Sequence, residues 1–210
     1  MKNALAIMAL VLVVAACNLT NKLKTNSNSN SSSSSSSSSN PSKIGNDPVE
    51  KPAPTGAQIA AIANGQDVKW DQQGISWTLP AGWKQQSPPT NNGFQWGNNG
   101  AVLIVSISPM GPDFPTDLSL NAYHESAKVR EKNGEVDELK WLELDGARGV
   151  EFRESKPQMA DDFRRLQWMT YRKFGGQTQL VNVMLSTSGG KFDSRSDELY
   201  GVLFSTKIVH

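Results

Sequence analysis

Apolar and polar positions alternate along much of the second half of this chain, in the pattern typical of strands with one buried face. The clearest case covers residues 139–144 and 147–154, where leucine, valine and phenylalanine alternate with charged residues. The two segments are separated by Asp145-Gly146, and Asp-Gly accepts the positive φ values that a type I′ turn requires. The pattern therefore predicts a β-hairpin here.

The same alternation predicts further strands elsewhere in the chain. Residues 163–174 and 177–187 flank Gly175-Gly176 and form a second predicted hairpin. Four earlier strands are predicted at 68–70, 75–79, 94–96 and 101–107. The last of these is a continuous apolar run, which is typical of a central strand covered on both faces.

Helical periodicity appears in three other segments. They are residues 58–63, 116 to about 132, and 192–204. Leu120, Tyr123 and Ala127 share one face of the second segment, and Leu199 and Leu203 share one face of the third. Helices that interrupt and follow runs of antiparallel strands return to cover the sheet. We therefore predict an α+β fold in which an antiparallel sheet lies between helices.

Residues 75–83, Ile-Ser-Trp-Thr-Leu-Pro-Ala-Gly-Trp, resemble the opening strand, proline turn and Gly-Trp of the PsbP-like family. That family includes the extrinsic photosystem II subunit, bacterial lipoproteins and the related Ran-binding Mog proteins. The two hairpins and the closing helix follow in the order that the resemblance implies over 68–209. It implies an α/β/α sandwich, and members that mostly bind or assemble with other proteins and are not established catalysts. No active-site residue of the family matches this chain.

The amino-terminal segment has a different pattern, in which Lys2 precedes an uncharged apolar run that ends in Val14-Ala15-Ala16-Cys17. As a helix, residues 4–16 cover about 20 Å, too short for a hydrocarbon core of roughly 30 Å. These are the marks of a secretory signal, and the closing cysteine resembles a lipobox, whose sulfur receives a diacylglycerol. We expect residues 1–16 to be cleaved and Cys17 to anchor a bacterial lipoprotein in the membrane, facing the periplasm or the cell surface. An ordinary secretory signal with a stray thiol is the alternative.

A low-complexity segment separates this anchor from the rest of the chain. Residues 25–55 are rich in Ser, Asn and Pro, with unbroken serine from 31 to 39, and carry too few apolar side chains to offset the entropy of ordering. We expect a lipidated amino terminus over 17–24, a disordered tether over 25–55, and one globular domain, expected to be monomeric, over 56–210. The tether is either a simple spacer or a means of carrying the domain across a cell-wall layer.

Charge and cysteine content narrow the classes of partner. The chain has 21 Lys and Arg against 20 Asp and Glu, and loss of residues 1–16 removes Lys2 alone, which leaves no net formal charge. Such a balance gives no strong attraction to nucleic acid or to anionic lipid surfaces. Cys17 is the one cysteine, so neither a disulfide nor a thiolate metal site is expected once it is lipidated.

Motifs for catalysis or metal binding are incomplete. His124-Glu125 begins like a zinc-protease helix, but Lys128 occupies the position of the second histidine, and we expect His124 on the helix surface. Residues 188–191 lack the first glycine and the final Ser or Thr of a phosphate-binding loop. Asp161-Asp162 lacks the spacing of a calcium loop. The sequence therefore predicts no catalytic residue, no metal ligand and no cofactor.

Candidate partner-binding residues are the remaining signal. Of six tryptophans, Trp70 and Trp96 lie near turns and are the better candidates for an exposed anchor, and Arg164 and Arg165 add positive charge to one hairpin. These observations favour a non-enzymatic envelope module that binds a protein. A carrier of a lipid or other apolar ligand is one alternative. A hydrolase is a weaker one, because it requires His124 to cluster with a serine and a carboxylate in a cleft.

Overall fold

A computed structural model describes residues 47–98 and 100–209, so the predicted signal peptide, Cys17 and the tether up to residue 46 lie outside the described residues. The described strands are β1 (Val49–Glu50), β2 (Gln66–Trp70), β3 (Ile75–Leu79), β4 (Lys84–Ser87), β5 (Gly93–Asn98), β6 (Ala101–Pro109), β7 (Val136–Leu144), β8 (Ala147–Glu154), β9 (Phe163–Phe174), β10 (Gln177–Ser188) and β11 (Lys207–Ile208). The described helices are α1 (Gly56–Ile62), the 3-10 helix η1 (Asp71–Gln73), α2 (Thr116–Lys132) and α3 (Gly189–Phe204).

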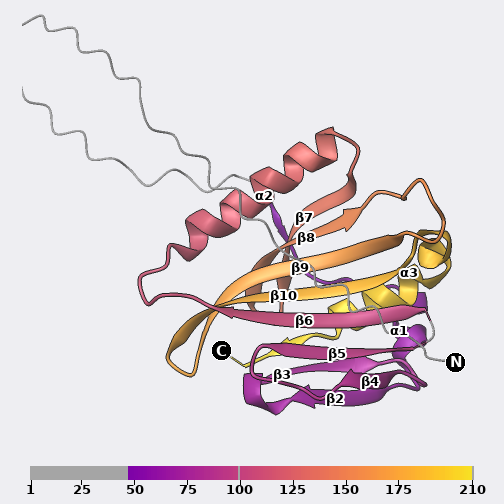
Figure 1. Cartoon of the computed structure of the whole chain (residues 1–210), viewed down its shortest axis with the longest axis horizontal. Helices are drawn as coiled ribbons and strands as arrows, with labels where there is room; N and C mark the ends of the chain where they lie inside the picture. Colours follow the sequence, from indigo (N-terminus) through magenta and orange to yellow (C-terminus); the bar gives the residue numbers. More distant parts are fainter. Residues whose placement is uncertain (1–46, 99, 210) are drawn as a thin grey trace, which may run out of the picture. The chain divides into compact units, whose positions relative to one another are not determined.

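Eight strands form one sheet in the order β1-β7-β8-β9-β10-β6-β5-β4. Every neighbouring pair is antiparallel except β1 and β7, which are parallel. α2 packs on one face of this sheet over β7, β8 and β9, while α3 packs on the other face (Figure 1). The predicted α+β fold, with an antiparallel sheet between helices, is confirmed. A second sheet, β11-β3-β2, lies on the α3 side and was not expected from local patterns.

The two predicted hairpins are confirmed together with their turns. Asp145 and Gly146 join β7 to β8 with φ angles of 48° and 87°, and Gly175 and Gly176 join β9 to β10 with φ angles of 58° and 79°. Two consecutive positive φ values are the mark of a type I′ turn, which matches the right-handed twist of the strands it joins. The turn chemistry thus fixes the register of β7 against β8 and of β9 against β10.

The main core lies between the large sheet and the layer formed by α3 and the small sheet. Four tryptophans with almost no exposed surface fill much of it, namely Trp70, Trp77, Trp83 and Trp168. Three of their indole N–H groups find acceptors: Trp70 donates to the Thr90 carbonyl at 3.0 Å, Trp83 to Glu198 at 2.6 Å, and Trp168 to the Leu142 carbonyl at 3.0 Å. Most of the tryptophans are therefore packing residues, as expected for large side chains with one polar group.

Residues 49–51, near the start of the described part of the chain, pack against the edge strand β7. Val49 and Glu50 form β1 and pair with Trp141 and Leu142 of β7, and Lys51 lies 3.4 Å from Glu143. A capping box at Thr55 then starts α1. The predicted boundary of the tether at residue 55 is therefore wrong for residues 47–55. The reason is that β7 offers an unpaired edge whose backbone groups bind even a polar segment.

The ends of the helices follow the predicted signals with one shift. α2 runs from Thr116 to Lys132 as predicted, and Gly134 follows it with a φ of 78°. α3 begins at Gly189, three residues before the predicted start at Phe192. Gly189 is packed so closely that a Cβ atom there would lie 2.3 Å from Cγ of Pro157. Its role is thus close packing of the helix start.

Candidate functional site

The face of the large sheet that carries α2 divides into two halves. Under α2, several outward side chains of β7, β8 and β9 are apolar and buried. With α2 they form a second core cluster, which we call the covered half: Leu120, Ala127, Val136, Trp141, Val150, Phe152 and Met169. No helix packs over β10, β6 and β5 on this side within the described part of the chain. The sheet therefore presents half of one face to solvent.

This uncovered region follows from the alternation along β6. Leu103 and Val105 are fully buried against the main core, whereas Val102, Ile104 and Ser106 point the other way and are half-buried. The prediction that this strand is covered on both faces is wrong. The apolar run marks a central strand, but the element that would cover its second face is missing, because α2 lies over β7, β8 and β9 instead.

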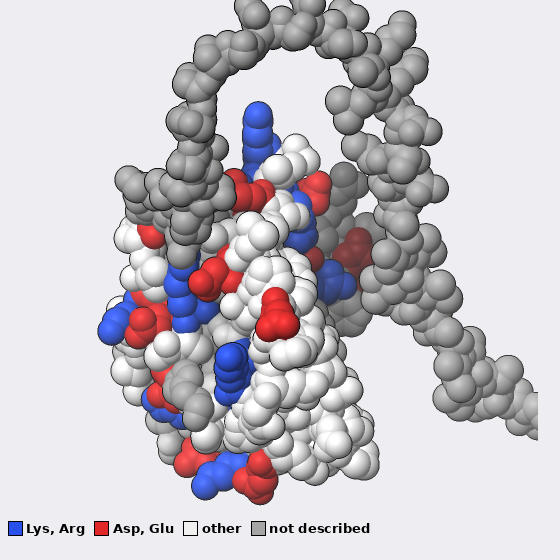
Figure 2. All heavy atoms as spheres, turned by 90° about the vertical axis from the view of Figure 1, so that its left-hand side faces the viewer, with Lys and Arg blue, Asp and Glu red and all other residues white. Residues whose placement is uncertain are grey.

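The side chains of this region share one property, which is that none of them is charged. We call it the open face and define it by the half-buried residues Gln95, Val102, Ile104, Ser106, Asn182 and Met184. In Figure 2, the lower right part of the visible surface carries neither acidic nor basic groups, in keeping with this composition. Lys and Glu are depleted at the centres of protein interfaces, so an uncharged, partly apolar face has the composition of a docking surface.

A groove of about 650 Å³ lies at one end of the open face. Val102 and Ile104 contribute apolar wall, Gln95 and Ser186 contribute polar groups, and Asp161 and Lys191, which are not part of the open face, add one charge of each sign. Phe163, whose residue surface is 63% exposed, also lines the groove. Large aromatic side chains that are exposed at the edge of an uncharged face are the usual anchors of protein contacts.

The two adjacent arginines that we singled out point to opposite sides of β9. Arg165 lies directly opposite Ser186 at the border of the open face, with its side chain 43% exposed and 3.0 Å from Glu154. Arg164 is buried on the other side, where it donates to the Glu154 carbonyl and to the carboxylates of Asp137 and Asp193. The expectation of an exposed Arg164 is wrong, since this side chain ties β7 and α3 to β9. Arg165 stays a candidate contact.

The two candidate tryptophans differ in the same way. Trp70 is 1% exposed, stacks on Phe94 with ring centroids 5.6 Å apart, and donates to the Thr90 carbonyl. Its expected exposure is therefore wrong, because the loop that contains Thr90 closes over it. Trp96 is half-buried and packs against the main core. Its part in partner binding stays a prediction.

A dense cluster of charged groups lies on the α3 side of β7 and β8. Lys140 Nζ is 2.7 Å from Glu138 and 3.0 Å from Glu151, and Arg153 Nη1 is 2.9 Å from Glu138. The Tyr200 hydroxyl of α3 donates to Glu138 at 2.8 Å. Four of these residues, Glu138, Lys140, Arg153 and Tyr200, line a cavity of about 320 Å³.

Glu151 is the most perturbed carboxyl in this cluster. Burial raises its pKa to about 7, against the opposing attraction of Lys140, and its Oε1 has no hydrogen-bond partner among the described residues. A carboxyl that titrates near neutrality is a usual candidate for acid–base chemistry. However, Glu151 is 0% exposed and is not among the residues that line the neighbouring cavity. A substrate cannot reach it, so the cluster acts as the polar joint between the sheet and α3.

His124 is buried and not on the helix surface, which corrects the prediction. Its ring stacks on Trp141 with centroids 4.4 Å apart, and burial lowers its pKa below the ordinary value. It lines a cleft of about 220 Å³ together with Asp47, Glu50, Lys128 and others, but no serine lines that cleft. The arrangement that a hydrolase requires is thus missing around His124.

Metal and membrane sites have no support in the described residues. Residues 47–98 and 100–209 contain no group of three or more His, Cys, Asp or Glu side chains placed to hold a metal ion. None of the helices in this part of the chain is long and apolar enough to cross a membrane. The open face and its groove are therefore the strongest candidate site.

Comparisons with known proteins bear on the fold. No protein-family model matches this chain, and no curated protein matches it. The structure is similar to a cyanobacterial PsbP (CyanoP) from Synechocystis sp. PCC 6803, with 16% identity, a TM-score of 0.46, and coverage of 69% of this chain and 92% of that one.

Two further solved structures are similar at 12% identity. One is LpqN, involved in cell envelope biogenesis of Mycobacterium tuberculosis, with a TM-score of 0.43 and coverage of 70% of this chain and 86% of that one. The other is the Ran-binding protein Mog1p of Saccharomyces cerevisiae, with a TM-score of 0.41 and coverage of 70% and 96%. At identities this low, the likeness concerns the fold alone.

The sequence analysis did not predict the residues of the open face as a site. Their signal is present in the pattern of β6 and β10, where every second position is apolar and buried and the positions between are uncharged. On β7, β8 and β9, the corresponding alternation brings in Glu, Lys and Arg. The absence of charge at water-facing positions of two neighbouring strands is therefore the feature that marks the site.

Proposed function

We propose that the mature protein is a lipid-anchored, non-enzymatic module of the bacterial cell envelope that binds a partner protein through its open face. One observation carries the proposal: half-buried, uncharged side chains occupy the water-facing positions of three adjacent strands. Sheet positions that only meet water commonly carry Lys, Glu or Arg, which favour solubility and discourage association. The exposed Phe163 and the groove that it lines also support a binding surface at this place.

The chemistry of the open face favours a protein over a lipid. Attachment to an anionic membrane surface requires Lys and Arg, and the open face contributes neither. A carrier of an apolar ligand requires an apolar cavity, but between the sheet and α3 the space is filled by fully buried Trp168, Phe192, Leu199 and Leu203. The open face combines apolar side chains with amide and hydroxyl groups, and this composition suits contact with the surface of a folded protein, which is also partly apolar and partly polar.

The lipid anchor would make a weak affinity for the partner sufficient. Lipidation of Cys17 would hold the domain near the membrane, and the tether would let it search for an anchored partner. Confinement of two proteins on one membrane raises their effective concentration, so that a modest affinity is sufficient. The domain itself needs no nucleophile or cofactor for this role.

The proposal is tested by photo-crosslinking in intact cells. A photoreactive amino acid at Ile104 is expected to give one dominant crosslinked protein, whereas the same group at Lys69, an exposed residue of β2, is expected to give none. Ile104→Arg is expected to lower capture of that protein by about ten-fold, because a buried unpaired charge at an interface costs more than 1.4 kcal/mol. Equal crosslinking from both positions would contradict the open face as the docking surface.

The anchor is tested separately. Labelled palmitate is expected to enter the wild-type protein and to be absent from Cys17→Ser, which should move to the soluble fraction. A Cys17→Ser protein that stays in the membrane fraction without label would contradict lipid anchoring. It would leave the docking result intact.

A further inference from the structure

Residues 47–54, which we call the strap, lie along the edge of the large sheet before α1 begins. None of these residues is buried, and only Pro52 is half-buried. Among the described residues, the backbone of the strap pairs with the sheet only through Val49 and Glu50, which lie beside Trp141 and Leu142 of β7. An attachment this short buries little apolar surface, so it contributes little to the stability of the fold.

Ion pairs supply the rest of the attachment, and most of their side chains are well exposed. The strap carries three charged residues, and the rest of the domain meets each of them with the opposite charge. The pairs are Asp47 with Lys128 at 2.8 Å, Lys51 with Glu143 at 3.4 Å, and Glu50 with Lys140 at 4.0 Å. Ion pairs between exposed side chains stabilise little and weaken as salt is added. The strap is thus held mainly by contacts that water and salt can replace.

Two cavities border the strap. The cleft of about 220 Å³ that also contains residues of α2 is lined by Asp47, Pro48 and Glu50 of the strap. The cavity of about 320 Å³ that also contains residues of α3 is lined by Glu50, Lys51 and Ala53. A segment that borders two such spaces lacks the close packing that holds a core element in place.

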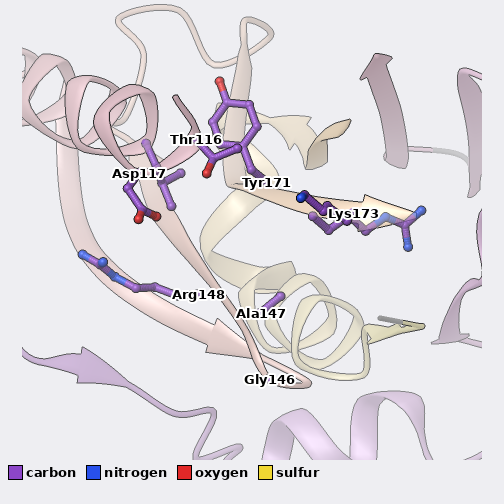
Figure 3. A pocket seen from close by; sticks show the side chains of 9 residues that line it. Thr116, Asp117, Gly146, Ala147, Arg148, Tyr171 and Lys173 are labelled. Atoms are coloured by element: carbon purple, nitrogen blue, oxygen red, sulfur yellow. The ribbon is translucent and has the colours of Figure 1, made fainter. Parts of the chain in front are cut away.

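A third cavity shows that empty space alone does not loosen an element. It has a volume of about 370 Å³ and lies beneath the first turn of α2, where side chains of α2, β8 and β9 surround it (Figure 3). Its wall includes Leu120, which is buried in the covered half and holds α2 on the sheet. The strap contributes no buried residue to the cavities that it lines.

The attachment becomes firm where α1 begins. Thr55 and Gln58 form the capping box of this helix, and Ile62 at its end packs against the main core. α1 also lies so close to α3 that a Cβ atom at Gly201 would be 2.6 Å from the carbonyl oxygen of Gln58. Loss of the strap contacts therefore stops at Thr55 and leaves the core intact.

We propose that the strap detaches reversibly from β7 and α2 while the rest of the domain stays folded, so that the tether has a short and a long state. Residues 47–54 span at most about 28 Å when extended, and release adds this segment to the tether. A longer tether would let a domain anchored at Cys17 reach a more distant partner. That use rests on the function proposed above, whereas the detachment itself does not.

Spin-label distance measurements on the mature chain with Cys17→Ser test the detachment, because this chain has no other cysteine. Labels on the exposed positions Pro48→Cys and Lys173→Cys report on the strap, and labels on Glu131→Cys and Lys173→Cys report on α2 as a control. The strap pair is expected to give a narrow short distance together with a broad longer one. The control pair is expected to give one narrow distance. Added salt is expected to raise the broad fraction of the strap pair alone.

Charge reversal decides whether the ion pairs hold the strap. Asp47→Lys places two positive charges together and is expected to raise the ratio of released to attached molecules by about five-fold or more. Lys128→Asp in the same chain restores an ion pair with reversed signs and is expected to bring the ratio back. Asp113→Lys makes the same charge change at an exposed residue outside the strap and is expected to leave the ratio unchanged.

Three results would overturn the proposal. The first is a single narrow strap distance in both the wild-type protein and Asp47→Lys, and the second is an equal effect of Asp113→Lys. The third is a broad distance in the control pair, which would mean that the whole domain loosens. These measurements use the isolated protein, so a failure of partner binding at the open face would not change them.

Discussion

The covered half and the open face occupy the same side of one sheet, and their side chains differ in kind. Under α2, the sheet presents Trp141, Val150 and Phe152, which are buried. A few strands away, it presents Ile104 and Met184 among amides and hydroxyls, all half-buried. The side chains that define the two regions are uncharged, and only the covered half has a helix over it; Glu143 and Arg148 lie on the same side of the sheet at the β7–β8 turn, outside both regions.

The difference between the two regions shows what a missing cover implies. A sheet face that always meets water tends to collect charged residues, and one that is always covered collects large apolar residues. The open face has neither composition. It resembles the surface of an interface that forms and separates, where apolar groups must be hidden when bound and tolerated when free. We therefore read the open face as covered by a partner for part of the time.

The largest expected effect separates the two regions by one substitution. Val150→Lys places a charge in the fully buried covered half and is expected to lower the free energy of unfolding by more than about 4 kcal/mol, since an unpaired buried charge is among the costliest changes. Ile104→Lys on the open face is expected to cost less than about 1 kcal/mol, because the ammonium group reaches water. Denaturant unfolding measures both, and equal losses would show that the open face is not open.

A second effect concerns the opposite face of β8, where Glu151 is buried under α3. The raised pKa, about 7 against 4.5, means that the neutral carboxyl stabilises the fold fully below about pH 4.5. This stabilisation is lost as the pH rises through about 7, and is on the order of 3 kcal/mol. Glu151→Gln is expected to remove that slope from the free energy of unfolding. Glu131 is an exposed residue of α2, and Glu131→Gln is expected to keep the slope. A wild-type slope in Glu151→Gln would show that Glu151 is not its source.

The smallest effect concerns the attachment of α2 to the covered half. His124 stacks on Trp141, and its lowered pKa means that the neutral ring stabilises the fold above about pH 6.5 and that this contribution is lost as the pH falls through the pKa in the folded protein. His124→Gln is expected to cost about 1 kcal/mol at pH 7.5 through loss of the stack. An NMR titration of His124 with a midpoint at or above 6.5 would contradict its burial.

The sequence predicted those parts of the fold that depend on local chemistry. Asp145-Gly146 and Gly175-Gly176 specify their own turns, and the alternation on either side specifies the strands. The burial of His124 was not predictable in this way, because it depends on where Trp141 of a different element lies. β1 was missed for the same reason, since its pairing is provided by the edge of β7 and not by its own residues.

The candidate site was less predictable than the fold. Trp70 and Arg164 have the residue types of contact groups, but Phe94 and the Thr90 loop enclose the first, and Asp137 and Asp193 bind the second. Residue type alone does not separate a buried tryptophan from an exposed one. The open face consists of ordinary residues that become a site only because α2 lies elsewhere.

Two methionines allow the central claim to be measured directly. Met184 lies on the open face and Met169 lies under α2, so mild oxidation of the isolated protein is expected to convert Met184 well before Met169. In intact cells, a partner bound to the open face is expected to protect Met184 and to bring its rate close to that of Met169, and lysis with dilution should restore the difference. If Met184 is oxidised as readily in cells as in the isolated protein, the open face has no partner there and the account is wrong.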